Sequence, residues 1–299
     1  MRILVTGKEG QVDTSLQQLG DAMPDIEVIR IGLPDIDLSR PETLERPVRE
    51  ARPDVIVSSA AYTAVDRAES EPALAEAINA AGPGELARLA KIMNLPLLHL
   101  STDYVFPGDK DSPYIETDTP GPVSVYGLTK LSGEMAIENA TANHVILRTA
   151  WVYSPFGGNF VKTMLRLGET RDEVNVVADQ HGCPTYALEI AQALIVVARR
   201  VTADPDSALR GIFHLTGCGE TTWAGFAEAI FDGAARRGRN PVKVNPIEAS
   251  AYPTPAKRPA NSRLSGQKLK DVYGLELKPW LTSLDDCLDR LLNREEGLA

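Results

Sequence analysis

Residues 100–130 carry the side chains with the clearest potential for chemistry in this sequence. Ser101 and Thr102 end an apolar run, and Tyr126 and Lys130 follow at the start of a helix-favouring segment. A spacing of four residues places two side chains on one face of a helix. Because a nearby ammonium stabilises a phenolate, Lys130 is predicted to lower the pKa of Tyr126 from about 10 toward neutrality. A phenol of that kind can exchange a proton with a carbonyl oxygen.

The Tyr-x-x-x-Lys spacing alone is a weak signal. The alternative interpretation is an exposed helical pair without any chemistry, and the spacing does not separate the two. The remainder of the chain must therefore decide between them.

The first residues, MRILVTGKEGQ, predict a nucleotide-binding turn. A β-favouring run is followed by Gly7, Gly10 and a segment with helical periodicity from Val12 onward. Strand, glycine turn and helix bring the pyrophosphate of a dinucleotide to the amino terminus of the helix. The alternative is an ordinary strand-to-helix turn, in which glycines are also common.

Asp13 stands where a third glycine would allow close packing of helix and strand. An aspartate suits the first turn of a helix because of the helix dipole. It would repel a phosphate that it faced, so we predict that Asp13 points away from the pyrophosphate.

Composition excludes several classes of protein. The 299 residues are 43% hydrophobic and 24% charged, with a net charge of −10, which argues against a general nucleic-acid or membrane-surface binder. No apolar stretch approaches the ~20 residues that span a bilayer, and no signal peptide is recognisable. Three scattered cysteines fit a reduced, cytoplasmic protein, and Cys183 is interpreted as a buried filler. The four histidines are also scattered, so no catalytic metal is expected.

Strand-like and helix-like segments alternate along the chain, which predicts an α/β fold with a doubly wound, Rossmann-type parallel sheet. Ligands of such sheets bind outside the carboxyl ends of the strands, and Gly7, Ala60, Ala61 and Thr102 all follow expected strands. The expected strands are 3–5, 27–31, 54–58, 97–101, 145–149 and 211–215, and the expected helices are 41–51, 72–93, 126–139 and 189–201.

Beyond about residue 152 the alternation loosens, and glycine- and proline-rich loops become frequent. We predict a smaller carboxy-terminal lobe that binds substrate and faces the cofactor. The predicted nucleotide-binding domain covers residues 1–151 and about 187–216, and the lobe covers 152–186 and 217–299.

Several segments together resemble the extended short-chain dehydrogenase/reductase superfamily and, within it, the dTDP-4-dehydrorhamnose reductase family. The segments are GKEGQV, RPDVIVSSAAYTAVDRAESEP, LSTDYVFPG, VYGLTKLSGE, RTAWVY, NFVKTMLRL, DQHGCPT and AYPTPAKRPANSRL. The resemblance implies reduction of the C4 ketone of dTDP-4-dehydro-L-rhamnose to dTDP-L-rhamnose with reduced nicotinamide, the last step of dTDP-rhamnose synthesis. It implies that Tyr126 donates the proton, that Lys130 lowers its pKa and binds the nicotinamide ribose, and that Thr102 aligns the ketone. A threonine after a strand can also be a simple turn or helix cap.

The resemblance also implies a set of cofactor-binding residues: Gly7, Gly10, Gln11, Val12, Asp37, Leu38, Ala60, Ala61, Thr63, Tyr126 and Lys130. Asp37 has an alternative role as a turn cap. The second expected strand ends at Gly32 rather than at the acidic residue that grips an NAD ribose, and Arg30 is near enough to meet a 2′-phosphate. NADPH is therefore the expected cofactor, with NADH tolerated.

On the sugar-nucleotide side the resemblance points to a second set of residues. Arginine forks suit a diphosphate, and a tryptophan offers an apolar wall to a deoxysugar. The set is Val65, Asp66, Thr102, Asp103, Tyr104, Trp151, Asn159, Phe160, Gln180, Arg258, Asn261, Ser262 and Arg263. The aromatic residues have core packing as their alternative role.

Two other functions remain open at this stage: another nucleotide-sugar ketoreductase or epimerase, and a non-catalytic regulatory subunit that binds cofactor. Some family members form a magnesium-bridged dimer through an acidic residue of the first helix. That position is Ser15 here, so a monomer and a homodimer both remain possible.

Overall fold

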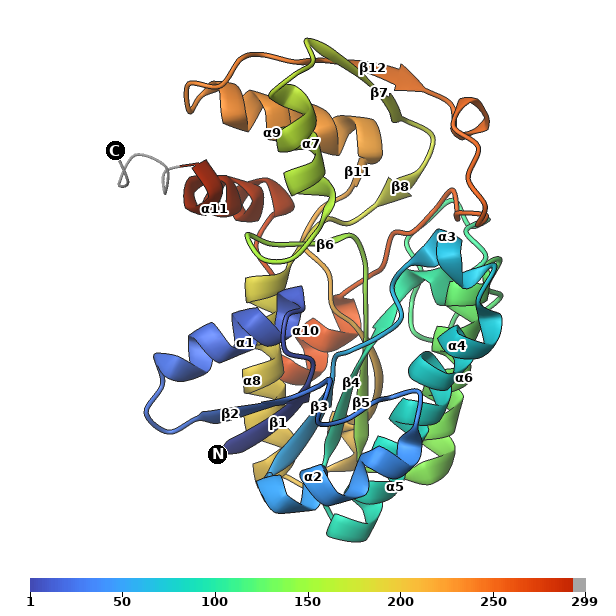
Figure 1. Cartoon of the computed structure of the whole chain (residues 1–299), viewed down its shortest axis with the longest axis vertical. Helices are drawn as coiled ribbons and strands as arrows, with labels where there is room; N and C mark the ends of the chain where they lie inside the picture. Colours follow the sequence, from blue (N-terminus) through green and yellow to red (C-terminus); the bar gives the residue numbers. More distant parts are fainter. Residues whose placement is uncertain (293–299) are drawn as a thin grey trace.

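Six parallel strands form one sheet in the computed structural model, which describes residues 1–292 (Figure 1). The strands are β1 (Arg2–Thr6), β2 (Glu27–Ile31), β3 (Val55–Ser58), β4 (Leu97–Thr102), β5 (His144–Thr149) and β10 (Gly211–His214). Their order across the sheet is β10-β5-β4-β3-β1-β2. The chain reverses its direction of winding between β1 and β3, and such a switch point is where doubly wound sheets bind ligands. The predicted Rossmann-type fold is confirmed.

Strand residues alternate between the two faces of the sheet because successive side chains point in opposite directions. Ile3 and Val5 of β1 belong to the core beneath α1 (Gln11–Asp21) and α8 (Ala187–Ala203). Leu4 belongs to the core on the other face, with Ile137 of α6 (Val125–Ala140). A sheet covered on both faces explains why its central strands are rich in apolar residues.

Helices cover both faces of this sheet (Figure 1). Besides α1 and α8, one face carries α10 (Gln267–Tyr273); besides α6, the other carries α2 (Glu45–Ala51), α4 (Pro72–Glu76) and α5 (Gly82–Met93). The helix expected over 41–51 begins with a 3-10 turn, η1 (Pro41–Thr43). The helix expected over 72–93 contains a π-helical segment, η2 (Ala77–Ala81). Pro83 follows that segment and has no N–H to donate to the preceding turn, which accounts for the change in register.

A second, smaller region lies beyond the carboxyl ends of the strands (Figure 1). Its core includes Tyr153, Phe226, Ile230 and Leu288. Its helices are α7 (Phe160–Gly168), α9 (Trp223–Ala235) and α11 (Trp280–Leu292). Its strands form three pairs: β12 (Lys243–Ile247) with β7 (Glu173–Val177), β11 (Thr221–Thr222) with β8 (His181–Gly182), and β6 (Val152–Tyr153) with β9 (Thr185–Tyr186). The short helices α3 (Val65–Ala68), η3 (Asp103–Val105), η4 (Ser207–Leu209) and η5 (Ala249–Ala251) complete the described elements.

The chain enters this region after β5, returns to the sheet through α8 and β10, and leaves it again. We keep the division at residues 151, 187 and 216 as a proposal, with the exception that α10, from the second part of the lobe, packs against the main sheet. No helix within residues 1–292 is long and apolar enough to cross a membrane.

Candidate active site

The turn after β1 has the geometry of a phosphate-binding turn. Gly7 has φ +117°, a conformation that favours glycine, and its N–H donates to the carbonyl of Ile31 at 2.7 Å. Gly10 is the N-cap of α1, and a Cβ there would lie 2.2 Å from Asp13 Oδ1. The N-terminus of α1, with the first N–H groups of the helix, therefore follows a turn that begins and ends with glycine, which suits an anionic ligand.

Asp13 lies against this turn and is almost fully buried. One carboxylate oxygen accepts a hydrogen bond from the N–H of Gly10 at 3.2 Å. Burial raises the pKa of Asp13 to about 6. A carboxyl group with this pKa is partly neutral near pH 6, which lessens its repulsion of phosphate. Its orientation relative to a bound pyrophosphate stays a prediction.

Two cationic side chains lie at the ends of β1 and β2. Arg30 donates to the carbonyl of Lys8 at 2.8 Å, and Lys8, which the sequence analysis missed, forms an ion pair with Asp35. Arg30 therefore lies beside the glycine turn, where the adenosine end of a dinucleotide is expected. Its contact with a 2′-phosphate stays a prediction.

Asp37 and Leu38 have structural roles here. Asp37 accepts hydrogen bonds from the N–H and hydroxyl of Ser39 at 2.9 and 2.6 Å, and these bonds lower its pKa. This is the turn-cap role considered for Asp37. Leu38 is buried in the core under α5. Any contact of this pair with adenine stays a prediction.

The segment after β3 is held to β1 by one hydroxyl. Thr6 Oγ1 accepts from the N–H groups of Ser59 and Ala60 at 3.0 and 3.1 Å. This bond fixes Ala60 and Ala61 at the switch point of the sheet, whereas Thr63 is exposed.

Gln11 and Asn159 join the two regions of the molecule. Asn159 caps α7 by accepting from the N–H of Lys162 at 3.1 Å, and its amide donates to Gln11 Oε1 at 3.0 Å. Gln11 in turn donates to the carbonyl of Val152 at 3.3 Å. The neighbouring Val12 is buried in the core. Gln11 and Asn159 were predicted for the cofactor and the sugar respectively, and the structure brings them together.

Thr102 and Tyr126 meet at the carboxyl end of β4. Ser124 caps α6 and so fixes its first turn, which carries Tyr126. The phenol is hydrogen-bonded to the side chain of Thr102, and its ring packs edge-on against Tyr104 at 5.6 Å. Thr102 also caps η3 by accepting from the N–H of Tyr104 at 3.2 Å, and it donates to Asp103 Oδ1 at 2.9 Å. Thr102 is thus both the turn cap and the partner of the phenol.

Lys130 lies one helical turn after Tyr126 and is 2% exposed. Its ammonium donates to the carbonyl of Leu100 at 2.8 Å and lies 3.1 Å from Nε2 of His99. Burial lowers the pKa of Lys130 to about 8.

The prediction that Lys130 lowers the pKa of Tyr126 is wrong. Burial raises the pKa of Tyr126 to about 12, the bond from Thr102 opposes this, and the charge of Asp103 adds to it. The ammonium is bonded to groups of β4 instead. The four-residue spacing predicts that Tyr126 and Lys130 share one face of α6, but it does not predict how deeply each side chain is buried.

Asp66 and Arg258 form a contact between the two regions. The guanidinium of Arg258 donates to both carboxylate oxygens of Asp66 at 3.0 and 2.8 Å, and the N–H of Ala256 donates to the same carboxylate at 3.1 Å. Arg258 is also hydrogen-bonded to Tyr104, which places it near the phenol of Tyr126. Val65, the neighbour of Asp66 in α3, is half-buried.

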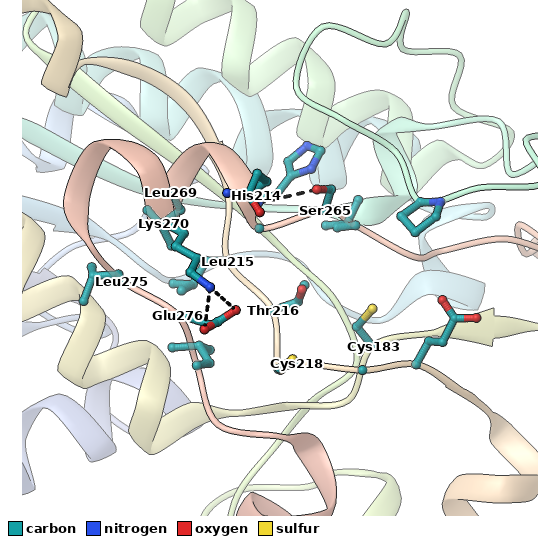
Figure 2. Close-up of a pocket in the computed structure, with 18 residues that line it drawn as sticks. Cys183, His214, Leu215, Thr216, Cys218, Ser265, Leu269, Lys270, Leu275 and Glu276 are labelled. Carbon is teal, nitrogen blue, oxygen red and sulfur yellow. Dashed lines mark hydrogen bonds and ion pairs between the residues drawn. The ribbon is translucent and has the colours of Figure 1, made fainter.

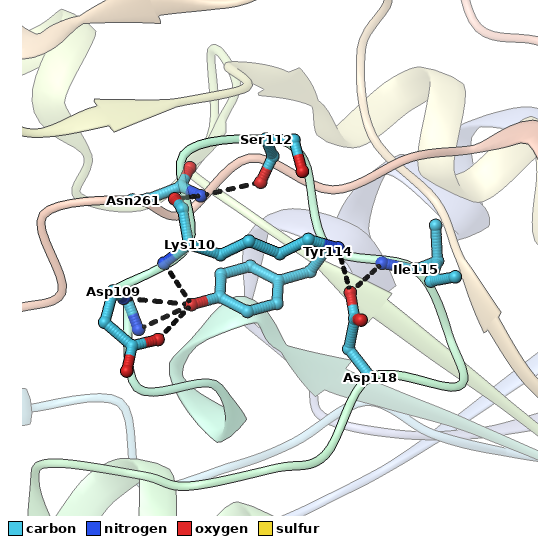
Figure 3. A network of polar contacts seen from close by, with 8 residues as sticks. Asp109, Lys110, Ser112, Tyr114, Ile115, Asp118 and Asn261 are labelled. Carbon is cyan, nitrogen blue, oxygen red and sulfur yellow. Dashed lines mark hydrogen bonds and ion pairs between the residues drawn. The ribbon is translucent and has the colours of Figure 1, made fainter.

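Asn261 holds two loop carbonyls (Figure 3). Its amide donates to the carbonyls of Lys110 and Ser112 at 2.6 and 2.9 Å. Arg263 donates to Asn261 Oδ1 at 2.8 Å and to Glu220 at 2.9 Å. The guanidinium groups of Arg258 and Arg263 share no partner among the described residues, so the structure does not join them into one diphosphate clamp.

Ser262, between these residues, is buried and hydrogen-bonded to Asp103. Burial raises the pKa of Asp103 to about 6. Within residues 1–292 the second carboxylate oxygen of Asp103 is fully buried and has no hydrogen-bond partner. An unpartnered buried acceptor is costly, so it marks this position, next to Thr102, as a candidate for a ligand contact.

The aromatic side chains of the smaller region stack on one another. Trp151 and Trp223 are parallel with ring centroids 3.6 Å apart, and Phe160 contacts Trp223 at 4.7 Å. Trp151 has φ +48°, and a Cβ at Gly182 would lie 2.3 Å from its indole. Gly182 therefore makes room for the indole, and Gln180 lies just before it in the chain.

Four residues of this neighbourhood were missed by sequence reasoning: Trp223, His99, Glu134 and Arg148. Glu134 follows Lys130 by one turn and forms a buried ion pair with Arg148 of β5, at 2.6 Å. The spacing of Tyr126, Lys130 and Glu134 at four-residue intervals was a usable signal. Trp223 had no such signal, because only folding places it against Trp151.

A separate cavity of about 230 Å³ lies near the ends of β10 and α10 (Figure 2). Cys183, His214, Lys270 and Glu276 are among the residues that line it. None of the predicted site residues does so. Cys183 is buried, and burial raises the pKa of its thiol to about 11, as expected of a filler. No group of His, Cys, Asp and Glu side chains within residues 1–292 could hold a metal ion.

Comparison with known proteins gives one consistent family. Residues 1–293 match the family described as RmlD substrate binding domain. A dTDP-4-dehydrorhamnose reductase of Sinorhizobium fredii is 52% identical over 280 residues, 94% of each chain. The crystal structure of a dTDP-4-dehydrorhamnose reductase from Clostridium acetobutylicum superposes with a TM-score of 0.90 at 37% identity, covering 97% of this chain and 99% of that one.

The dTDP-4-dehydrorhamnose reductase of Bacillus anthracis, solved in complex with NADP, superposes with a TM-score of 0.89 at 33% identity over 97% of this chain and 99% of that one. The resemblance inferred from the sequence motifs is therefore confirmed along almost the whole chain. The chain belongs to the RmlD substrate binding domain family.

Proposed function

We propose that this protein reduces the C4 ketone of dTDP-4-dehydro-L-rhamnose to dTDP-L-rhamnose with NADPH, as the last step of dTDP-rhamnose synthesis. The observation that carries the proposal is the placement of the Tyr126 phenol beside Thr102 and Tyr104 at the carboxyl end of β4. It lies on the edge of the sheet that also carries the glycine turn. The names of the relatives support the choice of substrate.

Tyr126 is the proton donor in this proposal. Because its pKa is about 12, the phenol is protonated at neutral pH. The alkoxide formed at O4 is a stronger base than a phenolate, so transfer of the proton from Tyr126 to O4 is favourable. Thr102 lowers the pKa of the phenol; its hydroxyl hydrogen, which is donated to Asp103, would stabilise the phenolate that remains if it turned to Tyr126.

The residues around the glycine turn fit a dinucleotide. Glycine is required at Gly7 and Gly10 because the carboxylate of Asp13 takes the space of a side chain there, and Arg30 lies beside this turn, where a 2′-phosphate is expected. Bound NADPH supplies the hydride that adds to C4. Lys130 would bind the nicotinamide ribose, because β4 uses two of its three N–H groups and no group within residues 1–292 takes the third.

The sugar nucleotide would lie between the two regions. Arg258 would bind the diphosphate with a fork that Asp66 shares. Trp151, stacked on Trp223, would form a wall for the deoxysugar. Asp103 and Ser262 would face the sugar hydroxyls, since one oxygen of Asp103 lacks a partner.

We further propose that the enzyme works in the cytoplasm, as a monomer or a homodimer. The net charge of −10 argues against nucleic-acid and membrane-surface partners.

The test is NADPH consumption in the presence of the dTDP-4-keto sugar, with identification of the product. Formation of dTDP-L-rhamnose is the expected result. The other C4 epimer would indicate a different nucleotide-sugar ketoreductase, and isomerisation without net NADPH loss would indicate an epimerase. NADPH binding without turnover would favour the regulatory-subunit alternative, and each of these three outcomes would overturn the proposal.

A further inference from the structure

A row of buried polar side chains lies under the catalytic helix. Ser58 of β3 and His99 of β4 are paired in register on adjacent strands, and both are fully buried. His99 Nδ1 is 3.0 Å from the hydroxyl of Ser58, and its Nε2 is 3.1 Å from Nζ of Lys130. The imidazole therefore bridges the sheet and the ammonium of the active-site lysine.

The partners determine which ring nitrogen carries the proton. An ammonium can only donate, so Nε2 of His99 must accept from Lys130. Nδ1 then carries the hydrogen and donates to Ser58. Burial and the charge of Lys130 hold the pKa of His99 well below its ordinary value, so the ring stays neutral and acts as a fixed acceptor.

This row does not lead to solvent. Within residues 1–292 the hydroxyl of Ser58 has no hydrogen-bond partner other than His99, and the residue is fully buried. A chain of hydrogen bonds that ends in the core cannot resupply a proton to the active site. His99 is thus placed to hold Lys130 rather than to relay protons.

We propose that His99 is a positioning residue of this reductase, whose neutral ring keeps the Lys130 ammonium charged and directed toward the cofactor site. The catalytic meaning of this inference rests on the proposed function. The contact itself depends only on the geometry of β3, β4 and α6.

Several titratable groups face this site. Tyr126 and Glu134 lie one turn to either side of Lys130 on α6, Asp103 follows β4, and His144 and Arg148 lie on β5. The charge of Glu134 favours the ammonium, although burial dominates and lowers the pKa of Lys130 to about 8. Cofactor affinity should therefore fall as the pH rises through about 8, and the loss of an acceptor should move this fall to lower pH.

The experiment compares wild type with His99→Leu and His99→Gln. The glutamine places an acceptor oxygen near the position of Nε2, and the leucine has none. NADPH affinity and kcat/KM are measured as functions of pH. We expect the alkaline limb of both curves to move down by about one pH unit in His99→Leu and to return to the wild-type position in His99→Gln.

His214→Leu is the matched control, because it also removes a buried histidine of the sheet, one on β10 whose ring nitrogens have no hydrogen-bond partner within residues 1–292. It should leave the limb in place. The proposal would be overturned if the alkaline limb of the pH profiles did not move in His99→Leu. It would also be overturned if the limb moved equally in His99→Leu and His99→Gln. His99→Asn, which is polar but too short to reach Lys130, gives the same readout should the leucine variant not fold.

The affinity curve needs no sugar nucleotide. A wild-type protein that binds NADPH but does not reduce the keto sugar would overturn the proposed function alone, and the role of His99 would still be decided by the affinity curve.

Discussion

The buried side of α6 and the loop around Arg258 each carry an arginine–carboxylate pair, but the two pairs lie in different surroundings. Arg148 and Glu134 have side chains only 2% and 1% exposed, whereas Arg258 and Asp66 are 24% and 41% exposed. The first pair joins α6 to β5, and the second joins segments that lie on either side of the proposed substrate site.

The difference in exposure indicates which of the two ion pairs is rigid and which can exchange partners. A buried ion pair cannot lose one partner cheaply, because an uncompensated charge would remain in the core. A half-exposed pair contributes about 0–1 kcal/mol and can exchange partners. We therefore expect the proposed proton donor to be held rigidly on α6, and we propose that Arg258 exchanges part of its contact with Asp66 for the diphosphate.

The largest effect is expected at the proton donor itself. Tyr126→Phe removes the transferable proton and should lower kcat about 10²–10⁴-fold, with NADPH affinity unchanged. Steady-state kinetics and a cofactor titration measure this. A near-normal rate would mean that another group donates the proton.

The buried ion pair of Glu134 and Arg148 is tested by Glu134→Gln. Arg148 would then be buried without a counter-charge, and the free energy of unfolding should fall by about 3–5 kcal/mol. Urea denaturation measures the loss. Glu138→Gln, at an exposed position one turn further along α6, is the matched control and should change little. Equal stabilities of the two variants would remove the distinction between the regions.

The exchangeable pair is tested by Arg258→Ala. The loss of charge-assisted hydrogen bonds to the diphosphate should raise the KM for the sugar nucleotide at least about tenfold, with little change in stability or in cofactor affinity. Lys257→Ala, an exposed neighbour, is the control. An unchanged KM would place the diphosphate elsewhere.

The smallest effect is expected at the adenosine end. Arg30→Ala should weaken NADPH binding about tenfold and leave NADH binding nearly unaffected, because only NADPH carries the 2′-phosphate. Arg40→Ala, whose partner is Asp37, serves as the control. Parallel losses for both cofactors would mean that Arg30 supports the turn through Lys8 and does not bind phosphate.

The sequence by itself determined the parts of this protein that depend on local order. Alternating apolar segments predicted the parallel sheet, the glycines after the first strand predicted the turn before α1, and the four-residue spacing placed Tyr126 and Lys130 on one helical face. These features follow from backbone periodicity and from the conformational freedom of glycine, which are properties of neighbouring residues. Strand and helix positions could be predicted on the same basis.

Only the tertiary structure decided how deep each group lies and which distant residue it meets. Burial set the pKa of Tyr126 at about 12 and that of Lys130 at about 8, so the pKa of the phenol is raised rather than lowered. The pairing of β3 with β4 brought Ser58 beside His99, and folding of the smaller region stacked Trp223 on Trp151. Desolvation and long-range contacts depend on what the whole chain packs around a group. The spacing of neighbouring residues therefore does not predict them.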